Sequence, residues 1–190
     1  MRPYIVVAML VPLLTGCPAA VVGGAAATAM VIDDRRTTGI QFEDQNIEIK
    51  ARHAIDEKYE KDDRVHVAVT SFNRYVLVSG QAPTEEIKHD IGVIVLGIEN
   101  VRNVQNEVTA GPATSFSQRS TDGYTTSKVK TKLMTDGSGK VSANHVKVVT
   151  EDNVVFLMGL VNRKEADAAT DIARTTGGVT KVVRVFEITD

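Results

Sequence analysis

The residues best suited to chemistry lie in one short stretch, DGYTTSKVKTKLM, which runs from Asp122 to Met134. It holds one aromatic residue and, after it, three lysines at alternate positions: Tyr124, Lys128, Lys130 and Lys132. Ammonium groups bind phosphate anions, and a tyrosine ring can stack on a nucleobase or sit at the surface of a bilayer. The stretch could therefore bind nucleic acid, lie on a membrane, or simply cover a hydrophobic core.

The rest of the chain offers little material for catalysis or for a cofactor. Its four histidines lack the HxH or HxxxH spacing of a metal site, and no G-x-S-x-G, Walker A or G-x-G-x-x-G motif occurs. The run GSGK, at residues 137–140, resembles a phosphate-binding loop, but no strand precedes it and we expect an ordinary connection. The sequence predicts a protein that is not an enzyme, with no catalytic residue, no metal and no cofactor.

Composition narrows the choice of partner only slightly. Of the 190 residues, 43% are hydrophobic, which suits one or two domains with ordinary cores. The formal net charge of −2 gives no general attraction to polyanions, so any basic surface must be local. Because Cys17 is the only cysteine, the chain can form neither an internal disulfide nor a cysteine-built zinc site.

The N-terminus has the pattern of a secretory signal peptide. Arg2 is followed by an apolar run from Ile5 to Leu14, which is too short to span a bilayer comfortably. The ending LTGC, at Cys17, resembles the bacterial lipobox. The resemblance implies that residues 1–16 are a signal peptide, that Cys17 carries the lipid anchor, and that residues 17–42 form a lipidated N-terminus and tether. Because Pro18 follows the cysteine in place of Asp, it also implies the outer membrane, on its periplasmic face. The alternative is an uncleaved anchor helix with a chance cysteine.

The remainder of the chain contains an internal repeat. The segment HVAVTSFNRYVLVSGQAPTEE, from His66, aligns with HVKVVTEDNVVFLMGLVNRKE, which starts 79 residues later at His145. So many ordered matches indicate two copies of one structural unit. The matches include Val67 with Val146, Val76 with Val155, Gly80 with Gly159, Glu86 with Glu165 and, after one deleted residue, Val101 with Val179.

Each copy predicts the element order helix, strand, strand, helix, strand. Apolar or small residues at every fourth position predict a first helix, with Asp44 as N-cap in one copy and Thr121 or Asp122 in the other. Alternating β-branched runs predict a hairpin closed within SFNR or EDN, and a second helix and a last strand follow. The expected ranges are 44–59, 65–70, 75–80, 84–96 and 101–109, then 121–135, 145–150, 154–160, 163–175 and 179–189.

This order predicts an α+β fold, in which two helices cover one face of a three-stranded sheet in each αββαβ two-layer sandwich. We place the domains at residues 43–110 and 120–190, with a linker at 111–119. The repeated pattern, clearest in NVVFLMGLVNRKEADAATDIA, resembles the BON domain, a small bacterial envelope module. A lipobox followed by two such units resembles the dual-BON-domain lipoproteins of Gram-negative outer membranes.

The two first helices differ in charge, which provides an internal control. Between Asp44 and Glu60 there are three basic and five acidic residues, whereas between Arg119 and Thr135 there are four basic residues and one acidic. Two copies of one fold do not need helices of opposite charge to be stable. The difference therefore favours a functional role for the basic helix, with random drift of a surface helix as the alternative.

Within the basic helix, Thr125, Val129 and Leu133 fall on one stripe at 100° per residue and are expected to face the core. A periplasmic location leaves no nucleic acid to bind, and the family resemblance implies that this helix contacts anionic phospholipid. The predicted lipid-binding residues are Tyr124, Ser127, Lys128, Lys130, Thr131 and Lys132.

The family resemblance also implies a part in outer-membrane integrity and in localisation to the division site. The alternative is a protein-interaction module without direct lipid binding. Such a module would dock through exposed strand edges on itself or on an envelope partner, for example in outer-membrane protein assembly.

Overall fold

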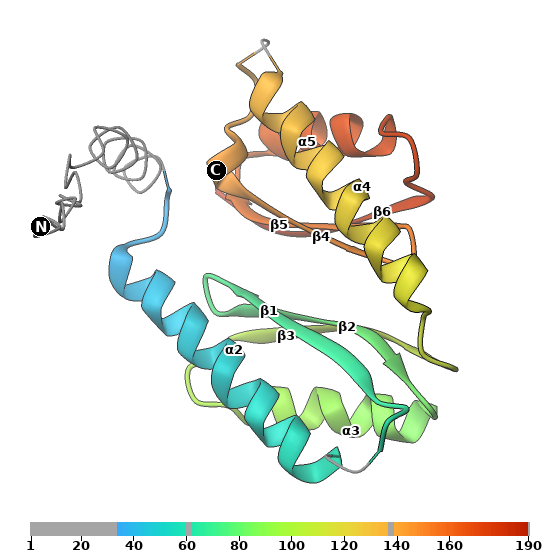
Figure 1. Cartoon of the computed structure of the whole chain (residues 1–190). Coiled ribbons are helices and arrows are strands. Elements are labelled where there is room, and N and C mark those ends of the chain that lie inside the picture. The colour runs from blue at the N-terminus through green and yellow to red at the C-terminus, as the bar shows by residue number, and fades with distance from the viewer. Residues whose placement is uncertain (1–33, 60–61, 137–138, 190) are drawn as a thin grey trace, which may run out of the picture. The chain divides into compact units, whose positions relative to one another are not determined.

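The computed structural model describes residues 34–59, 62–136 and 139–189. The predicted signal peptide, Cys17 and the first half of GSGK lie outside these ranges. Asp33–Asp190 forms one compact unit. Its elements, in chain order (Figure 1), are α2 Thr38–Tyr59, β1 His66–Phe72, β2 Tyr75–Ala82, α3 Glu85–Leu96, β3 Asn103–Ala110, α4 Phe116–Thr135, the 3-10 turn η1 Ala143–His145, β4 Val146–Glu151, β5 Val154–Val161, α5 Arg163–Arg174 and β6 Lys181–Ile188.

Each copy of the repeat builds its own three-stranded sheet, in the orders β1-β2-β3 and β4-β5-β6. The first two strands pair antiparallel, and the third pairs parallel with the middle strand. A parallel pair needs a crossover connection, which α3 and α5 provide. In Figure 1 the two helices of each copy lie on one face of its sheet, so the predicted α+β two-layer sandwich is confirmed.

The helix stripes predicted from the sequence are buried against these sheets. On α2 and α4, all six stripe residues are at most 2% exposed. All except the polar Thr125 belong to two separate hydrophobic cores, each completed by strand residues and by the second helix of the same copy. The stripe residues are Ile47, Ala51 and Ile55 on α2 and Thr125, Val129 and Leu133 on α4.

The opposite faces of the two sheets are also buried, because they share a third apolar cluster. Phe72 and Leu77 from the first copy join Phe156 and Met158 from the second, and all four are at most 5% exposed. The two copies are therefore held together by sheet residues as well as by the linker. Polar pairs also join the copies, with Gln81 Nε2 donating to Glu151 at 2.7 Å and Asn73 Nδ2 donating to Glu187 at 2.6 Å.

Both hairpins close through two-residue turns built from non-glycine residues in the left-handed region. The φ angles are 52° and 65° at Asn73 and Arg74, and 47° and 62° at Asp152 and Asn153. Two successive left-handed residues suit a type I′ turn, whose twist matches that of the strands. The turns fall within the predicted SFNR and EDN segments.

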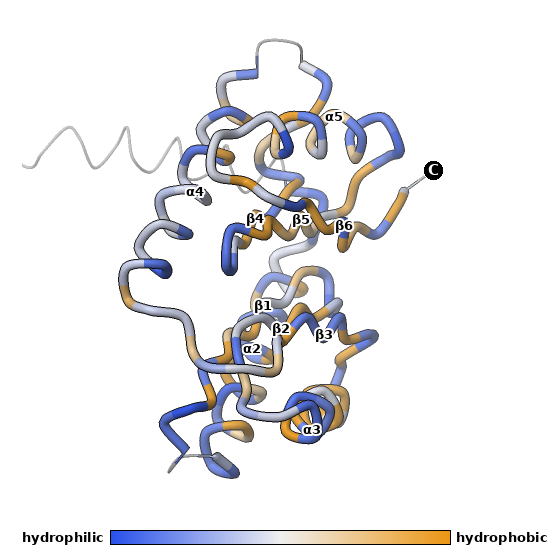
Figure 2. Tube along the Cα trace, turned by 90° about the vertical axis from the view of Figure 1, so that its right-hand side faces the viewer, coloured by the Kyte–Doolittle hydropathy of each residue, from blue (hydrophilic) through white to orange (hydrophobic). Residues whose placement is uncertain are grey.

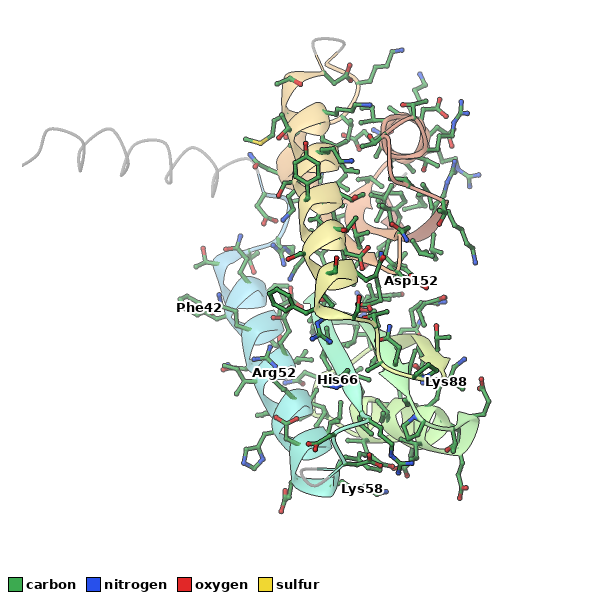
Figure 3. All side chains as sticks on the ribbon, turned by 45° about the vertical axis from the view of Figure 1, so that its right-hand side comes forward. Phe42, Arg52, Lys58, His66, Lys88 and Asp152 are labelled. Atoms are coloured by element: carbon green, nitrogen blue, oxygen red, sulfur yellow. The ribbon has the colours of Figure 1, made fainter. Side chains whose placement is uncertain are left out.

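A buried aspartate on each first helix holds the adjacent hairpin turn. Asp122, which is 4% exposed, accepts hydrogen bonds from the backbone N–H groups of Asp152 and Asn153, both at 2.9 Å. Figure 3 shows Asp152 beside the first half of α4. Asp44 binds the turn of the first hairpin in the same way. The prediction that these aspartates cap their helices is wrong, because their carboxylates bind the hairpin from inside the helix.

Both first helices begin earlier than predicted, α2 at Thr38 and α4 at Phe116. The N-cap of α4 is Ser115, whose Oγ accepts the N–H of Gln118 at 3.1 Å. No residue before Asp44 in α2 or before Asp122 in α4 is buried, so the first turns show no apolar periodicity. Residues assigned to the tether (17–42) and to the linker (111–119) therefore belong in part to helices.

The one-residue difference between the copies falls at Pro83, just before the second helix. Thr84 is the N-cap of α3 and Asn162 is the N-cap of α5, so residues from here on correspond at a spacing of 78. The predicted match of Glu86 with Glu165 is therefore wrong by one position, and Ile87 is the true equivalent of Glu165.

Candidate functional site

The outer face of α4 exposes three large side chains with apolar character. Phe116 is 78% exposed, Tyr124 66% and Met134 64%. Phe116 and Met134 are eighteen residues apart, which is five full turns, so they lie on one line along the helix. Of these three, only Tyr124 is among the lipid-binding residues predicted from the sequence; Phe116 falls in the predicted linker, residues 111–119.

Two of the predicted lysines are engaged with the end of α5. Lys128 Nζ donates to the carbonyl of Gly177 and lies 4.8 Å from the centroid of the Tyr124 ring. Lys132 Nζ donates to the carbonyl of Thr175 at 3.0 Å. The carboxyl end of a helix carries partial negative charge, which favours the contact of Lys132 with Thr175, the C-cap of α5; Gly177 lies in the turn that follows. These lysines therefore stabilise the domain, and each retains donors for a ligand because an ammonium has three.

The remaining predicted residues, all on α4, differ in their position around the helix and in their hydrogen bonds. Lys130 is exposed, and its position on the helix is closer to the line of Phe116 and Met134 than to Lys132. Ser127 is exposed, but its hydroxyl donates to the Gly123 carbonyl at 3.0 Å. Thr131 is exposed as well. All six predicted residues thus lie on α4 outside the core stripe, and Lys130 adds a cation beside the apolar line.

The equivalent helix of the first copy shares the exposed apolar residues but not the charge. On α2, Phe42 is 63% exposed and Ile49 61%. Figure 3 shows Phe42 and Arg52 on α2. The helix carries five acidic and three basic residues, against one and four on α4. Charge, rather than exposed apolar area, is what distinguishes the two helices.

A charged cluster at the start of α5 was not found from the sequence. Asn162 and Glu165 form a capping box, and Arg35 donates to both carboxylate oxygens of Glu165 at 2.7 and 2.8 Å. Burial opposes the ionisation of Glu165, but the bonds from Arg35 and from the Asn162 N–H outweigh it, so the pKa of Glu165 lies below its usual range. Arg35 lies 130 residues away in the chain, in a segment assigned to the tether, so no local pattern indicated the contact.

The equivalent histidines lie at strand entrances, as their positions predicted. His66 begins β1, and His145 ends the short turn before β4, 3.4 Å from the Glu165 carboxylate. Within the described ranges, no three His, Cys, Asp or Glu side chains gather in a way that could hold a metal ion. The absence of catalytic residues and cofactors stays a prediction.

Comparison with known sequences gives the family. The BON domain model matches residues 43–112 and 121–190. The chain belongs to the BON domain family. It is 41% identical over 177 residues to "Outer membrane lipoprotein DolP" of Haemophilus influenzae, covering 93% of this chain and 91% of that protein. It is 33% identical to the "21 kDa hemolysin" of Actinobacillus pleuropneumoniae, over 80% of this chain and 78% of that protein. "Osmotically-inducible protein Y" of Escherichia coli is 31% identical, with 61% and 58% covered.

The basic helix α4 is thus the first helix of the second BON domain, and α2 is its acidic equivalent in the first. Among the described residues, no helix is both long enough and apolar enough to cross a bilayer.

Proposed function

We propose that this protein is an outer-membrane lipoprotein, anchored through Cys17 on the periplasmic side, whose second BON domain binds anionic phospholipid. Family membership and the similarity to a protein named outer membrane lipoprotein DolP support the location. The observation that carries lipid binding is the combination, on α4 and on no other helix that the structure describes, of exposed large apolar or aromatic side chains (Phe116, Tyr124 and Met134) with a net positive charge.

The contribution of each group follows from its place on the helix. Phe116, Tyr124 and Met134 enter the headgroup region, where aromatic and apolar side chains are favoured. Each lysine near an anionic surface adds about 1 kcal/mol. Because the lipid anchor keeps the domain close to the bilayer, its effective concentration is high and weak intrinsic affinity suffices.

The test is co-sedimentation of residues 18–190, which include the whole compact unit, with vesicles of phosphatidylglycerol or of phosphatidylcholine at several salt concentrations. We expect binding to the anionic vesicles only, weakening as salt rises. The variant Lys130→Glu with Met134→Ser removes a cation and an apolar contact that have no structural role in α4, and we expect it to lose at least tenfold in binding. Lys128 is left intact because it binds the Gly177 carbonyl.

The matched control is Arg52→Glu with Phe42→Ser on α2, which makes the same chemical change on the equivalent helix of the first BON domain. It should bind as the parent does. Undiminished binding by the α4 variant, or equal loss in both variants, would contradict the proposal. The family resemblance extends the proposal to envelope integrity and division-site localisation.

A second candidate function, docking of a protein partner, is favoured by one observation: a groove beside the edge strand of the second sheet.

A further inference from the structure

A groove of about 400 Å³ separates α5 from β6 in the second BON domain. Its floor is apolar and its rims are charged. Ile188, at one end, is 41% exposed. Two arginines and one aspartate line the groove, and Arg184 pairs with Asp167 at 2.8 Å. The lining residues are Arg163, Ala166 and Asp167 from α5 and Arg184, Phe186 and Ile188 from β6.

One wall of the groove is a free strand edge. β6 pairs with β5 on one side, and on its other side no strand follows within the part of the chain that the structure describes. An edge strand presents backbone N–H and C=O groups in an alternating row. The groove therefore offers both apolar contact and a template for backbone hydrogen bonds.

In the first BON domain the equivalent groove is closed by a side chain. Asn106 of β3 donates from Nδ2 to the carbonyl of Lys88 on α3 at 2.7 Å. Gly92 makes room for this amide, since a Cβ at that position would lie 2.7 Å from Asn106 Nδ2. In the first domain a side chain of the last strand thus bridges to the backbone of the second helix.

The second domain replaces both residues of this closure. Thr170 stands at the position of Gly92, and its hydroxyl donates to the Ala166 carbonyl at 2.6 Å. Arg184 stands at the position of Asn106 and pairs with Asp167 at 2.8 Å, on the rim. The strand also changes from NVQNEVTA to KVVRVFEI, and Figure 2 colours β6 more hydrophobic than β3. The link between the last strand and the second helix is a part-buried amide hydrogen bond in one copy, and an exposed ion pair beside a more apolar strand in the other.

We propose that the groove between α5 and β6 binds an extended peptide segment of a partner protein, which adds to the outer edge of β6 as a fourth strand. Alternate apolar side chains of the peptide lie over Phe186 and Ile188, and a peptide carboxylate lies toward Arg184. An acyl chain lacks the donors and acceptors that a strand edge requires. A second copy would bring its own Arg184 toward the Arg184 of the first, which disfavours self-association.

The groove is separate from the outer face of α4, so this proposal does not depend on the proposed lipid binding. The probe is a displayed library of random nine-residue peptides, selected against residues 18–190. Enriched peptides are then measured by fluorescence polarisation. We expect alternating apolar residues with at least one acidic residue.

The decisive variant rebuilds the closure of the first domain, Thr170→Gly with Arg184→Asn, and should weaken binding at least tenfold. Ile188→Lys places a charge in the groove at an exposed position and should weaken binding similarly, even if the double variant fails to fold. Lys130→Glu with Met134→Ser on α4 should leave peptide binding unchanged. The proposal is overturned if no peptide is enriched, or if enriched peptides bind the folded closure variant or Ile188→Lys as tightly as the parent. It is also overturned if sedimentation shows a dimer that Ile188→Lys dissociates.

Discussion

Replacing Asp122 by alanine tests the most specific structural claim, that one carboxylate on α4 holds the β4–β5 turn. In the folded domain this carboxylate accepts two backbone N–H groups at 2.9 Å and the side-chain amide of Gln118 at 3.1 Å. With alanine at this position the two turn N–H groups lose their acceptor at a site where Asp122 itself is only 4% exposed, so water cannot easily replace the carboxylate. Two residues would also have to keep left-handed φ angles without that support.

The expected loss follows from the number of bonds. A hydrogen bond to a charged group contributes about 1.5–3 kcal/mol, so the two backbone bonds together contribute about 3–6 kcal/mol. The bond from Gln118 is nearer the surface and adds little. Since whole domains are stable by only about 5–15 kcal/mol, Asp122→Ala should leave the second BON domain marginally folded.

Urea denaturation followed by circular dichroism measures this loss. Thr121→Ala is the matched control, because the Thr121 hydroxyl bonds only the Ser117 carbonyl of its own helix. It should change the free energy of unfolding by less than about 0.5 kcal/mol. A loss below about 1 kcal/mol in Asp122→Ala, or a loss equal to that of the control, would refute the role assigned to this carboxylate.

Three further predictions concern other contacts. Because the folded pKa of Glu165 is depressed, its contribution to stability is present above the unfolded pKa of about 4.3 and is lost as pH falls through the folded pKa. The stability gap between the parent and Glu165→Gln, about 1–3 kcal/mol at pH 7, should therefore narrow as pH falls below about 4.3 in urea titrations. A constant gap would count against the Arg35 contact. Gly159→Ala places a Cβ 2.2 Å from the His145 carbonyl oxygen, and Gly80→Ala makes a similar clash at a φ of +117°. Both substitutions should lower the melting temperature, and Gly80→Ala should lower it more because its backbone angle also disfavours a side chain. The reverse order would contradict this account. Met158→Lys charges the buried cluster between the sheets, and calorimetry should then show two unfolding transitions where the parent shows one; a single transition in the variant would mean that the cluster does not couple the domains.

Much of the fold could be predicted because its signal is local and periodic. Ile47, Ala51 and Ile55 repeat every fourth residue because α2 packs on a sheet, and the alternating valines of β1 and β2 reflect the same burial. The early start of α4 could also have been found. Ser115 and Gln118 have the S-x-x-Q spacing of an N-terminal capping sequence, and that start would have placed Phe116 on the helix.

Other features depend on contacts that no local pattern contains. Lys128 and Lys132 look like free cations in the sequence, yet both bind carbonyls more than forty residues away, at the C-cap of α5 and in the turn after it. From the sequence, Arg35 looks like part of a solvated tether, but in the structure it pairs with Glu165. The Asn106 contact could not be read from the repeat either, because matching Glu86 with Glu165 puts the second helices one residue out of step and hides the equivalence of Gly92 with Thr170.

The aspartate-bound turns have a consequence for backbone amide exchange. Hairpin tips usually exchange with solvent rapidly, because their N–H groups face water. Here the amides of Asn73 and Arg74, and those of Asp152 and Asn153, are held by a carboxylate on a helix about thirty residues earlier. Each pair can exchange only when that helix leaves its sheet. The exchange rates of two turn amides in each domain therefore report how often the first helix of that domain leaves its sheet. One deuterium-exchange experiment measures these rates separately for the two domains.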